Sequence, residues 1–183
     1  MIRATVCSAN AHKLAEFEPL FPGFELELLG ARDYPPEDGE TFRENALIKA
    51  RFGRRVGPAD RVMLADDSGL EVAALGGAPG VSTARWAGNR HVERLLEALV
   101  DETDRRARYV CELVAISPAG RESFGRGVLE GTIGSAPAGG EGFGFDPVFV
   151  PLGEQRTVAQ LGDAWKARRS HRALAARALL SEV

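Results

Sequence analysis

Apolar and polar residues alternate in several short segments of the chain, a period of two that is typical of β-strands. Ile2, Ala4 and Val6 alternate in this way, as do the apolar residues of 24–28. Short apolar runs elsewhere add further candidates. The predicted strands are 2–7, 24–28, 62–65, 108–117, a returning strand through Phe124 and Val128–Ile133, and 148–150.

Helical patterns separate these strands. Apolar residues at helical spacing over 14–21 predict a helix that begins near Asn10. Thr41 and Glu44 form a capping-box pattern, which predicts a helix over roughly 41–55. Further helices are expected at 93–100 and after Ser170, which is a candidate cap.

The length of 183 residues favours a single domain over 1–183. Hydrophobic residues make up 44% of the chain and charged residues 27%, which is typical of a globular protein. Helices alternate with strands in the first part, and a turn at 118–120 indicates a hairpin in the middle. The sequence therefore predicts an α/β fold with a mixed sheet.

The net charge of −3 provides no basic field for a nucleic acid partner. No apolar run approaches the roughly 18 residues of a membrane span, and the N-terminus lacks the apolar region of a secretory signal. Cys7 and Cys111 lie among apolar residues and are expected to be reduced thiols. We therefore expect a cytoplasmic protein with no nucleic acid or membrane partner. Basic residues gather over 166–177, as either a solvated helix face or an anion-binding rim.

Asp66 and Asp67 follow the predicted strand 62–65, and Ser68 and Gly69 come next. Ligands bind beyond the carboxyl ends of strands in α/β sheets. Two adjacent carboxylates repel each other unless a cation or a proton joins them. This pattern suits a Mg²⁺ site in which one carboxylate also acts as a base. The alternative is a strand end with two solvated aspartates.

Ser8 to Lys13 connect the first strand to the first helix. A helix N-terminus attracts phosphate through its unpaired N–H groups, and Lys13 could reach a phosphate oxygen. The ring of His12 is expected to matter less than its backbone N–H. An Asn cap with a surface lysine is the alternative. Glu37, Asp38 and Glu40 precede the Thr41 cap, and one of them could supply an oxygen to Mg²⁺.

Two further segments could recognise a base. Gly142–Pro147 combines Phe143 and Phe145 with glycines, and aromatic rings can stack on bases, although phenylalanine is more often part of a core. His171 and Arg172 follow Lys166 by about one helical turn. Their N–H groups suit a 6-oxo purine and cannot satisfy a 6-amino group. The alternative is a serine cap with two solvated basic side chains.

The order and spacing of these motifs resemble those of the inosine/xanthosine triphosphate pyrophosphatase family. The matching blocks are SxNxxK, ExGxTFxENA from Glu37, ADDSGLEVxALGGAPG from Ala65, GFGFDPVF from Gly142, and Lys166 followed by SHR. The resemblance covers essentially the whole chain. It implies an elongated α/β domain with a long mixed β-sheet flanked by helices, an active-site cleft between two lobes, and a homodimer.

The resemblance also implies a reaction, the hydrolysis of dITP/ITP and dXTP/XTP to the monophosphate and pyrophosphate with Mg²⁺. Asp67 and Lys13 would be catalytic, and Glu37 and Asp67 would bind the metal. The implied substrate-binding residues are Ser8, Ala9, Asn10, Ala11, His12, Lys13, Ser68, Phe143, Gly144, Phe145, Asp146, Lys166, His171 and Arg172.

The chain departs from the family pattern at two places. Ala164-Trp165 stand where two acids are typical, and the segment after Gly88 is short. Two other functions stay open. A septum-inhibitor-type pyrophosphatase would act on other modified nucleotides, and a nucleotide- or RNA-binding protein would not catalyse a reaction.

Overall fold

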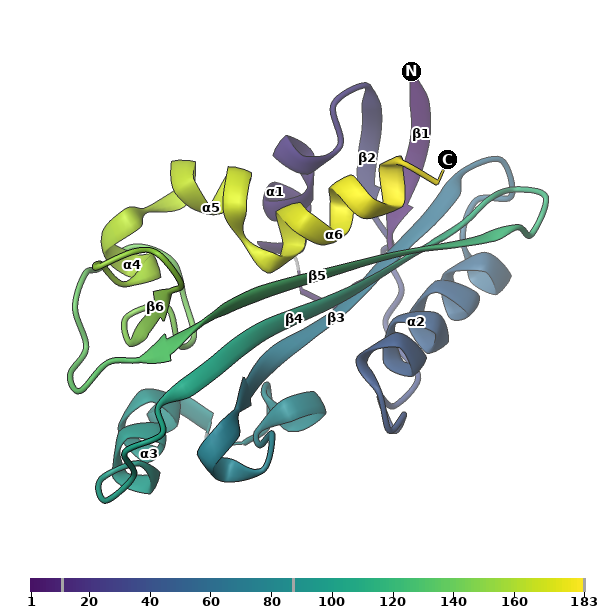
Figure 1. Ribbon diagram of the computed structural model, residues 1–183. Helices are drawn as coiled ribbons and strands as arrows, with labels where there is room; N and C mark the ends of the chain where they lie inside the picture. The colour runs from purple at the N-terminus through teal and green to yellow at the C-terminus, as the bar shows by residue number, and fades with distance from the viewer. Residues whose placement is uncertain (11, 87, 183) are drawn as a thin grey trace. The chain divides into compact units, whose positions relative to one another are not determined.

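The computed structural model describes residues 1–10, 12–86 and 88–182. Over these residues, six strands form one sheet in the order β2-β1-β3-β4-β5-β6 (Figure 1). β1 pairs in parallel with β2 and β3, whereas β6 is antiparallel to β5, which confirms the predicted α/β fold with a mixed sheet. The strands are β1 Ile2–Val6, β2 Phe24–Leu28, β3 Val62–Val72, β4 Arg106–Ile116, β5 Glu122–Ile133 and β6 Phe149–Pro151.

The helices confirm most of the predicted positions. The capping box is present, since the Thr41 hydroxyl accepts from the Glu44 N–H and the Glu44 carboxylate accepts from the Thr41 N–H. Two short helices before the final one were not predicted. The α-helices are α1 His12–Phe17, α2 Phe42–Val56, α3 His91–Ala98, α4 Val158–Leu161, α5 Asp163–Arg169 and α6 His171–Leu180, and the 3₁₀ turns are Glu18–Leu20, Ala73–Leu75, Gly80–Ser82 and Gly88–Arg90.

The strand at 62–65 is longer than predicted. β3 runs on through Asp66, Asp67 and Ser68 to Val72, so the two carboxylates lie within a strand and not beyond its end. The prediction was wrong because these residues are poor strand formers by local preference, whereas pairing within the sheet decides whether a strand continues. Consecutive side chains on a strand point to opposite faces, so Asp66 and Asp67 face different sides of the sheet.

The chain divides into two compact units. The first contains Met1–Asp67, Cys111–Gly127 and the residues from Arg172 onward, and the second contains Ser68–Val110 and Val128–His171. The prediction of a single domain over 1–183 stays a prediction. No helix within the described ranges is both long and apolar enough to cross a membrane.

In the first unit, helices cover both faces of the sheet. Figure 1 shows α2 and α6 on opposite sides of it. One face packs against α1 and α6, and the other packs against α2. Gly125 of β5 makes the close approach of α6 possible, because a Cβ there would lie 2.2 Å from the Ala175 carbonyl oxygen. The buried strand residues on the α1–α6 face are Ala4, Val6, Leu64, Cys111, Leu113 and Ala115. Those on the α2 face are Met63, Ala65, Val114 and Ile116.

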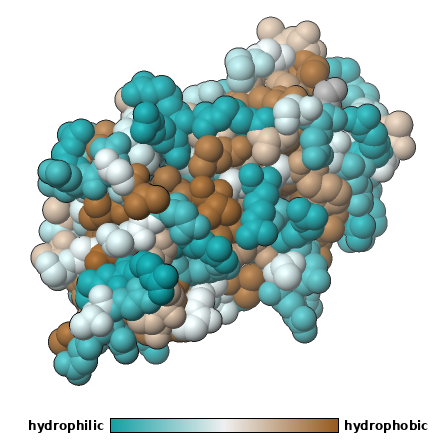
Figure 2. Space-filling view, viewed as in Figure 1, coloured by the Kyte–Doolittle hydropathy of each residue, from teal (hydrophilic) through white to brown (hydrophobic). Residues whose placement is uncertain are grey.

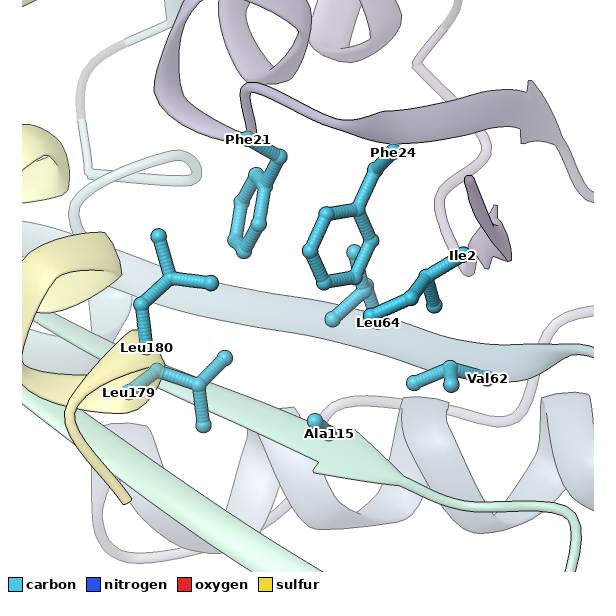
Figure 3. Close-up of a pocket in the computed structure, with 8 residues that line it drawn as sticks. All are labelled: Ile2, Phe21, Phe24, Val62, Leu64, Ala115, Leu179 and Leu180. Carbon is cyan, nitrogen blue, oxygen red and sulfur yellow. The ribbon is translucent and has the colours of Figure 1, made fainter. Parts of the chain in front are cut away.

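The α1–α6 side also contains a small apolar cavity of about 60 Å³ (Figure 3). Its walls come from β1, β2, β3, β4, α6 and the turn after α1, and none of its lining side chains is polar. A cavity of this kind reflects incomplete packing and offers nothing to bind a polar substrate. The lining residues are Ile2, Phe21, Phe24, Val62, Leu64, Ala115, Leu179 and Leu180.

The second unit has its own core around α3. Leu95 of this helix and Leu99, which follows its last residue, are fully buried, and they pack in one cluster with Leu70, Tyr109 and Phe149. This packing fixes the last part of β3 and the first part of β4, which belong to the second unit.

Hydrophilic and hydrophobic residues are interspersed on the face shown in Figure 2. The large apolar side chains that are most exposed, Met1, Leu152 and Val100, are far apart in the chain. Exposed apolar residues that occur singly are normal in globular proteins and do not indicate a binding surface.

Candidate active site

Asp66 is the centre of a buried ionic cluster in the first unit. Its carboxylate is 3% exposed and accepts from the Lys13 Nζ at 2.9 Å (Oδ1) and 2.6 Å (Oδ2). The Arg172 Nε donates to the same Oδ2 at 3.1 Å, and it lies 3.5 Å from Glu16 Oε2. Lys13 and Glu16 come from α1 and Arg172 from α6, the two helices that cover this face of the sheet. The cluster therefore contains two positive and two negative charges, which cancel.

Burial and charge act in opposite directions on this cluster. Burial favours the neutral form of Asp66, but the positive charges of Lys13, Arg172 and Lys49 outweigh it and hold the pKa of Asp66 well below its usual value. Burial, with the Arg172 charge, lowers the pKa of Lys13. Asp66 is consequently an anion at neutral pH. It fixes two basic side chains, of which Lys13 could meet a phosphate group.

Asp67 faces the other side of the sheet, toward α2. Its Oδ2 accepts from the Asn45 Nδ2 at 3.0 Å, and its Oδ1 lies 3.8 Å from the Lys49 Nζ. The same Lys49 ammonium is 3.0 Å from Glu37 Oε1. The carboxylates of Glu37 and Asp67 thus approach one cation, although they are far apart in the sequence.

Asn45 also fixes the loop that carries Glu37. Its side chain is fully buried, and its Oδ1 accepts from the Gly39 N–H at 2.8 Å. Gly39 has no room for a side chain, because a Cβ there would lie 2.7 Å from the Glu44 Cβ. One amide side chain therefore connects the loop to Asp67.

The electrostatic environment of Asp67 is the reverse of that of Asp66. Burial raises the pKa of Asp67, the nearby Glu37 and Asp66 charges raise it further, and Lys49 and the Asn45 hydrogen bond offset only part of the effect. A carboxylate in this state is a stronger proton acceptor than an ordinary aspartate.

The donor set at Glu37 and Asp67 also suits a hard cation. Mg²⁺ uses one or two carboxylates together with waters and substrate phosphates. A divalent cation beside Asp67 would offset the cost of burying its charge. Among the described residues, no three His, Cys, Asp or Glu side chains form a potential metal cage. Glu37 and Asp67, which approach the same Lys49 ammonium, form a pair of carboxylates that could hold such an ion.

The segment before α1 forms a tight turn. The Ser8 Oγ accepts from the Asn10 N–H at 3.1 Å, and the Asn10 carbonyl accepts from the Lys13 N–H. Ala9 and Asn10 are exposed. Ala11 and the side chain of His12 lie outside the described part of the chain. The other predicted phosphate-binding residues, Ser8, Ala9, Asn10 and Lys13, lie together at the start of α1.

Asp146 is the centre of a second cluster, in the second unit. Its Oδ2 accepts from the Lys166 Nζ at 2.7 Å and from the Phe143 N–H at 2.9 Å, and its Oδ1 accepts from the Tyr109 hydroxyl at 3.3 Å. The Lys166 Nζ also lies 4.2 Å from the centroid of the Phe143 ring. The structure thus brings together three predicted site residues, Phe143, Asp146 and Lys166.

The two aromatic residues of this segment have different environments. Phe143 is 52% exposed, whereas Phe145 is 2% exposed and packs near Trp86 and His91. Only Phe143 has a ring face that a ligand could reach. For Phe145, the core alternative that the sequence left open is the one observed.

His171 and Arg172 are adjacent in α6 but have different partners. The His171 ring is buried and stacks on Tyr109, with centroids 4.7 Å apart and an angle of 12° between the rings. Arg172 belongs to the Asp66 cluster of the first unit. Ser68 follows Asp67 in β3 and is half-buried. The roles predicted for these three residues stay predictions.

Sequence reasoning missed four residues that hold these clusters together, namely Glu16, Asn45, Lys49 and Tyr109. The first three lie in helices, where charged and polar residues are expected to face solvent. Tyr109 lies in an apolar strand, where its sequence context indicates only core packing. Contacts between distant segments give these residues their roles.

A mixed α/β sheet with a buried carboxylate that holds two basic side chains on one face, and a second carboxylate next to Glu37 and Lys49 on the other, suits a protein that acts on phosphate groups. The chain belongs to the Ham1 family, whose model matches residues 4–182. A dITP/XTP pyrophosphatase from an Exiguobacterium species is 43% identical, over 100% of this chain and 97% of the relative. These findings confirm the resemblance seen in the sequence.

Solved structures agree with this assignment. The Ham1 protein of Staphylococcus aureus superposes with a TM-score of 0.86 at 34% identity, covering 98% of this chain and 97% of that one. A HAM1 protein from Coxiella burnetii gives a TM-score of 0.85 at 37% identity and covers both chains completely. The α/β fold with a mixed sheet is thus the fold of the family.

Proposed function

We propose that this protein hydrolyses deaminated purine nucleoside triphosphates, namely dITP/ITP and dXTP/XTP, to the monophosphate and pyrophosphate. The observation that carries the proposal is the contrast between Asp66 and Asp67. Asp66 is buried and accepts from Lys13 and Arg172, whereas Asp67 faces the other side of the sheet, where it accepts from Asn45 and approaches the same Lys49 ammonium as Glu37. The names of the relatives, dITP/XTP pyrophosphatase, support this substrate class.

In this proposal, Asp67 accepts the proton of the attacking water. Asn45 orients the carboxylate of Asp67 through the hydrogen bond to Oδ2, which leaves Oδ1 facing Lys49, the residue that Glu37 also contacts. Glu37 and Asp67 would hold Mg²⁺, which when bound polarises the phosphates and lowers the pKa of the water. A general base of this kind contributes typically about 10²–10⁴-fold to a rate.

Lys13 and the backbone N–H groups at the start of α1 would neutralise phosphate charge that grows in the transition state. The Asp66 carboxylate holds Lys13 in place before substrate arrives, so little side-chain entropy remains to be lost on binding. The backbone N–H groups of the turn from Ser8 to the start of α1 would bind the triphosphate, with Ser68 as a further contact.

In the second unit, the exposed Phe143 ring would stack on the purine, next to the Lys166 ammonium. His171 and Arg172 would donate to the 6-oxo group, which an adenine lacks. A site that donates at this position leaves its donors unsatisfied when a 6-amino group binds, so it rejects dATP. The proposal also includes a homodimer located in the cytoplasm.

The first experiment measures pyrophosphate release from dITP, XTP and dATP, with Mg²⁺ and again with EDTA. Metal-dependent release from dITP and XTP, with little from dATP, is the expected result. Release from methylated or modified pyrimidine nucleotides alone would indicate a septum-inhibitor-type enzyme. Binding that persists in EDTA without any product would indicate a nucleotide-binding protein.

A further inference from the structure

His91 opens α3, and its ring lies between two backbone carbonyl groups. The Nε2 is 2.9 Å from the Gly144 oxygen, and the Nδ1 is 3.1 Å from the Gly88 oxygen. A carbonyl oxygen can only accept, so a hydrogen bond to Gly144 requires the proton on Nε2. The ring also meets Phe145 edge to face, with centroids 5.2 Å apart. His91 therefore connects the start of α3 to the segment that carries Phe143.

That segment is held at several adjacent points. Asp146 accepts from the Phe143 N–H, Phe145 is buried in the core, and His91 donates to the carbonyl between these two aromatic residues. Gly144 has φ +62°, a left-handed conformation that glycine adopts readily. A glycine at this position gives the peptide little restraint of its own, so the hydrogen bond from His91 adds to the backbone hydrogen bonds of Phe143 and Phe145 in fixing its orientation.

We infer that His91 is a positioning residue for base recognition. It fixes the Gly144 peptide so that the exposed Phe143 ring stays beside Lys166, ready to stack on a purine. The inference rests on the proposed function, in which Phe143 contacts the base, and it assigns His91 no contact with the substrate. Because the bond acts on the base-binding segment and not on Asp67, its loss should weaken substrate binding more than the chemical step.

Two substitutions separate the hydrogen bond from the packing. His91→Phe keeps an aromatic ring against Phe145 and removes both ring nitrogens, including the N–H that donates to Gly144. His91→Gln removes the ring and places an amide N–H near the position of Nε2. Arg90→Ala is the matched control, because Arg90 is the exposed neighbour and makes only a surface ion pair with Glu97 at 3.2 Å among the contacts described.

The test measures KM and kcat for dITP together with hydrogen exchange of the backbone amides of 142–147. His91→Phe should raise KM about fivefold and change kcat less than about twofold, as expected for one hydrogen bond. It should also speed exchange in this segment. His91→Gln should restore both values most of the way, and Arg90→Ala should match the wild type.

An unchanged KM and unchanged exchange in His91→Phe would overturn the inference. So would equal losses in His91→Phe and His91→Gln that follow a drop in thermal stability, because a purely structural role predicts that result. If wild-type protein releases no pyrophosphate from dITP, the proposed function fails, while hydrogen exchange still tests whether His91 holds Gly144.

Discussion

Lys13 donates to both carboxylate oxygens of Asp66, and Asp66 in turn accepts from Arg172. A residue at the start of α1 and a residue at the start of α6 are therefore fixed by one anion on β3. Asp66 fixes the positions of both basic side chains, so in the proposed reaction the substrate would meet an ordered site.

Asp66→Asn should destabilise the protein strongly. The substitution keeps the shape of the side chain but removes the charge that compensates two buried cations, and breaking such a group costs about 3 kcal/mol or more. The free energy of unfolding in urea provides the measurement. Asp60→Asn is the control, since Asp60 forms an exposed pair with Arg3 and should leave the urea midpoint unchanged.

Asp67→Asn should lower turnover by about a hundredfold or more, because the proposed general base is lost. Its stability should rise or stay the same. The pKa of Asp67 is raised in the folded state, so ionising it costs stability as the pH rises through that value. Asparagine cannot ionise and avoids this cost. Parallel activity and urea measurements at pH 7 check both points, and wild-type rates would contradict the assignment of Asp67.

Asp66 should affect the pH dependence of stability in the opposite direction to Asp67: it stabilises the folded protein at neutral pH, and this contribution is lost in acid. Its pKa is lowered in the folded state, so its contribution is complete above the unfolded value of about 3.9 and is lost as the pH falls below it. The difference in unfolding free energy between wild type and Asp66→Asn should therefore shrink between pH 4 and pH 2. A constant difference over this range would show that the Asp66 charge does not hold the cluster.

His171→Ala and Arg172→Ala should differ in their effects, although the residues are adjacent. His171 stacks on Tyr109 beside the Asp146 cluster, so its loss should mainly reduce the preference for dITP over dATP. Arg172 also belongs to the Asp66 cluster, so its loss should lower both the preference and the stability. Ratios of kcat/KM for the two nucleotides, with thermal midpoints, provide the comparison. An unchanged ratio in His171→Ala would remove its proposed role in reading the base.

Ala115→Val should stabilise the protein by about 0.5–1.5 kcal/mol, because the added methyl groups enter the apolar cavity of the first unit (Figure 3). Ala107→Val is the matched control. Ala107 lies on the same strand and is similarly buried, but it does not line this cavity, so a larger side chain should overpack the core and destabilise it. Urea unfolding of both variants distinguishes these outcomes.

The sequence predicted those helices and strands whose own residues carry the signal, without help from contacts to distant segments. The capping box of α2 and the alternation in β1 are of this kind, because the signal lies within a few neighbouring residues. β3 was cut short at Ala65 because its continuation depends on pairing with another strand. The capping box at Thr157 and Gln160 was a local signal for α4 that sequence reasoning overlooked.

The candidate site was predicted less completely than the fold. The residue types of Lys13, Glu37 and Asp67 indicate phosphate and metal chemistry directly. Lys49 and His91 have no such signal, because each acquires its role from a carboxylate or a carbonyl more than ten residues away in the chain. The exposure that distinguishes Phe143 from Phe145 likewise depends on the folded core and not on the local sequence.

Asp66 and Asp67 are chemically identical, so everything that distinguishes them comes from their position along β3. No point substitution can exchange the two residues, but adding or deleting one residue earlier in the strand would turn each carboxylate to the opposite face. Such a change would place the proton acceptor among the buried cations and the anchor beside Glu37. We therefore expect β3 to tolerate conservative apolar substitutions before Asp66 better than any change of length.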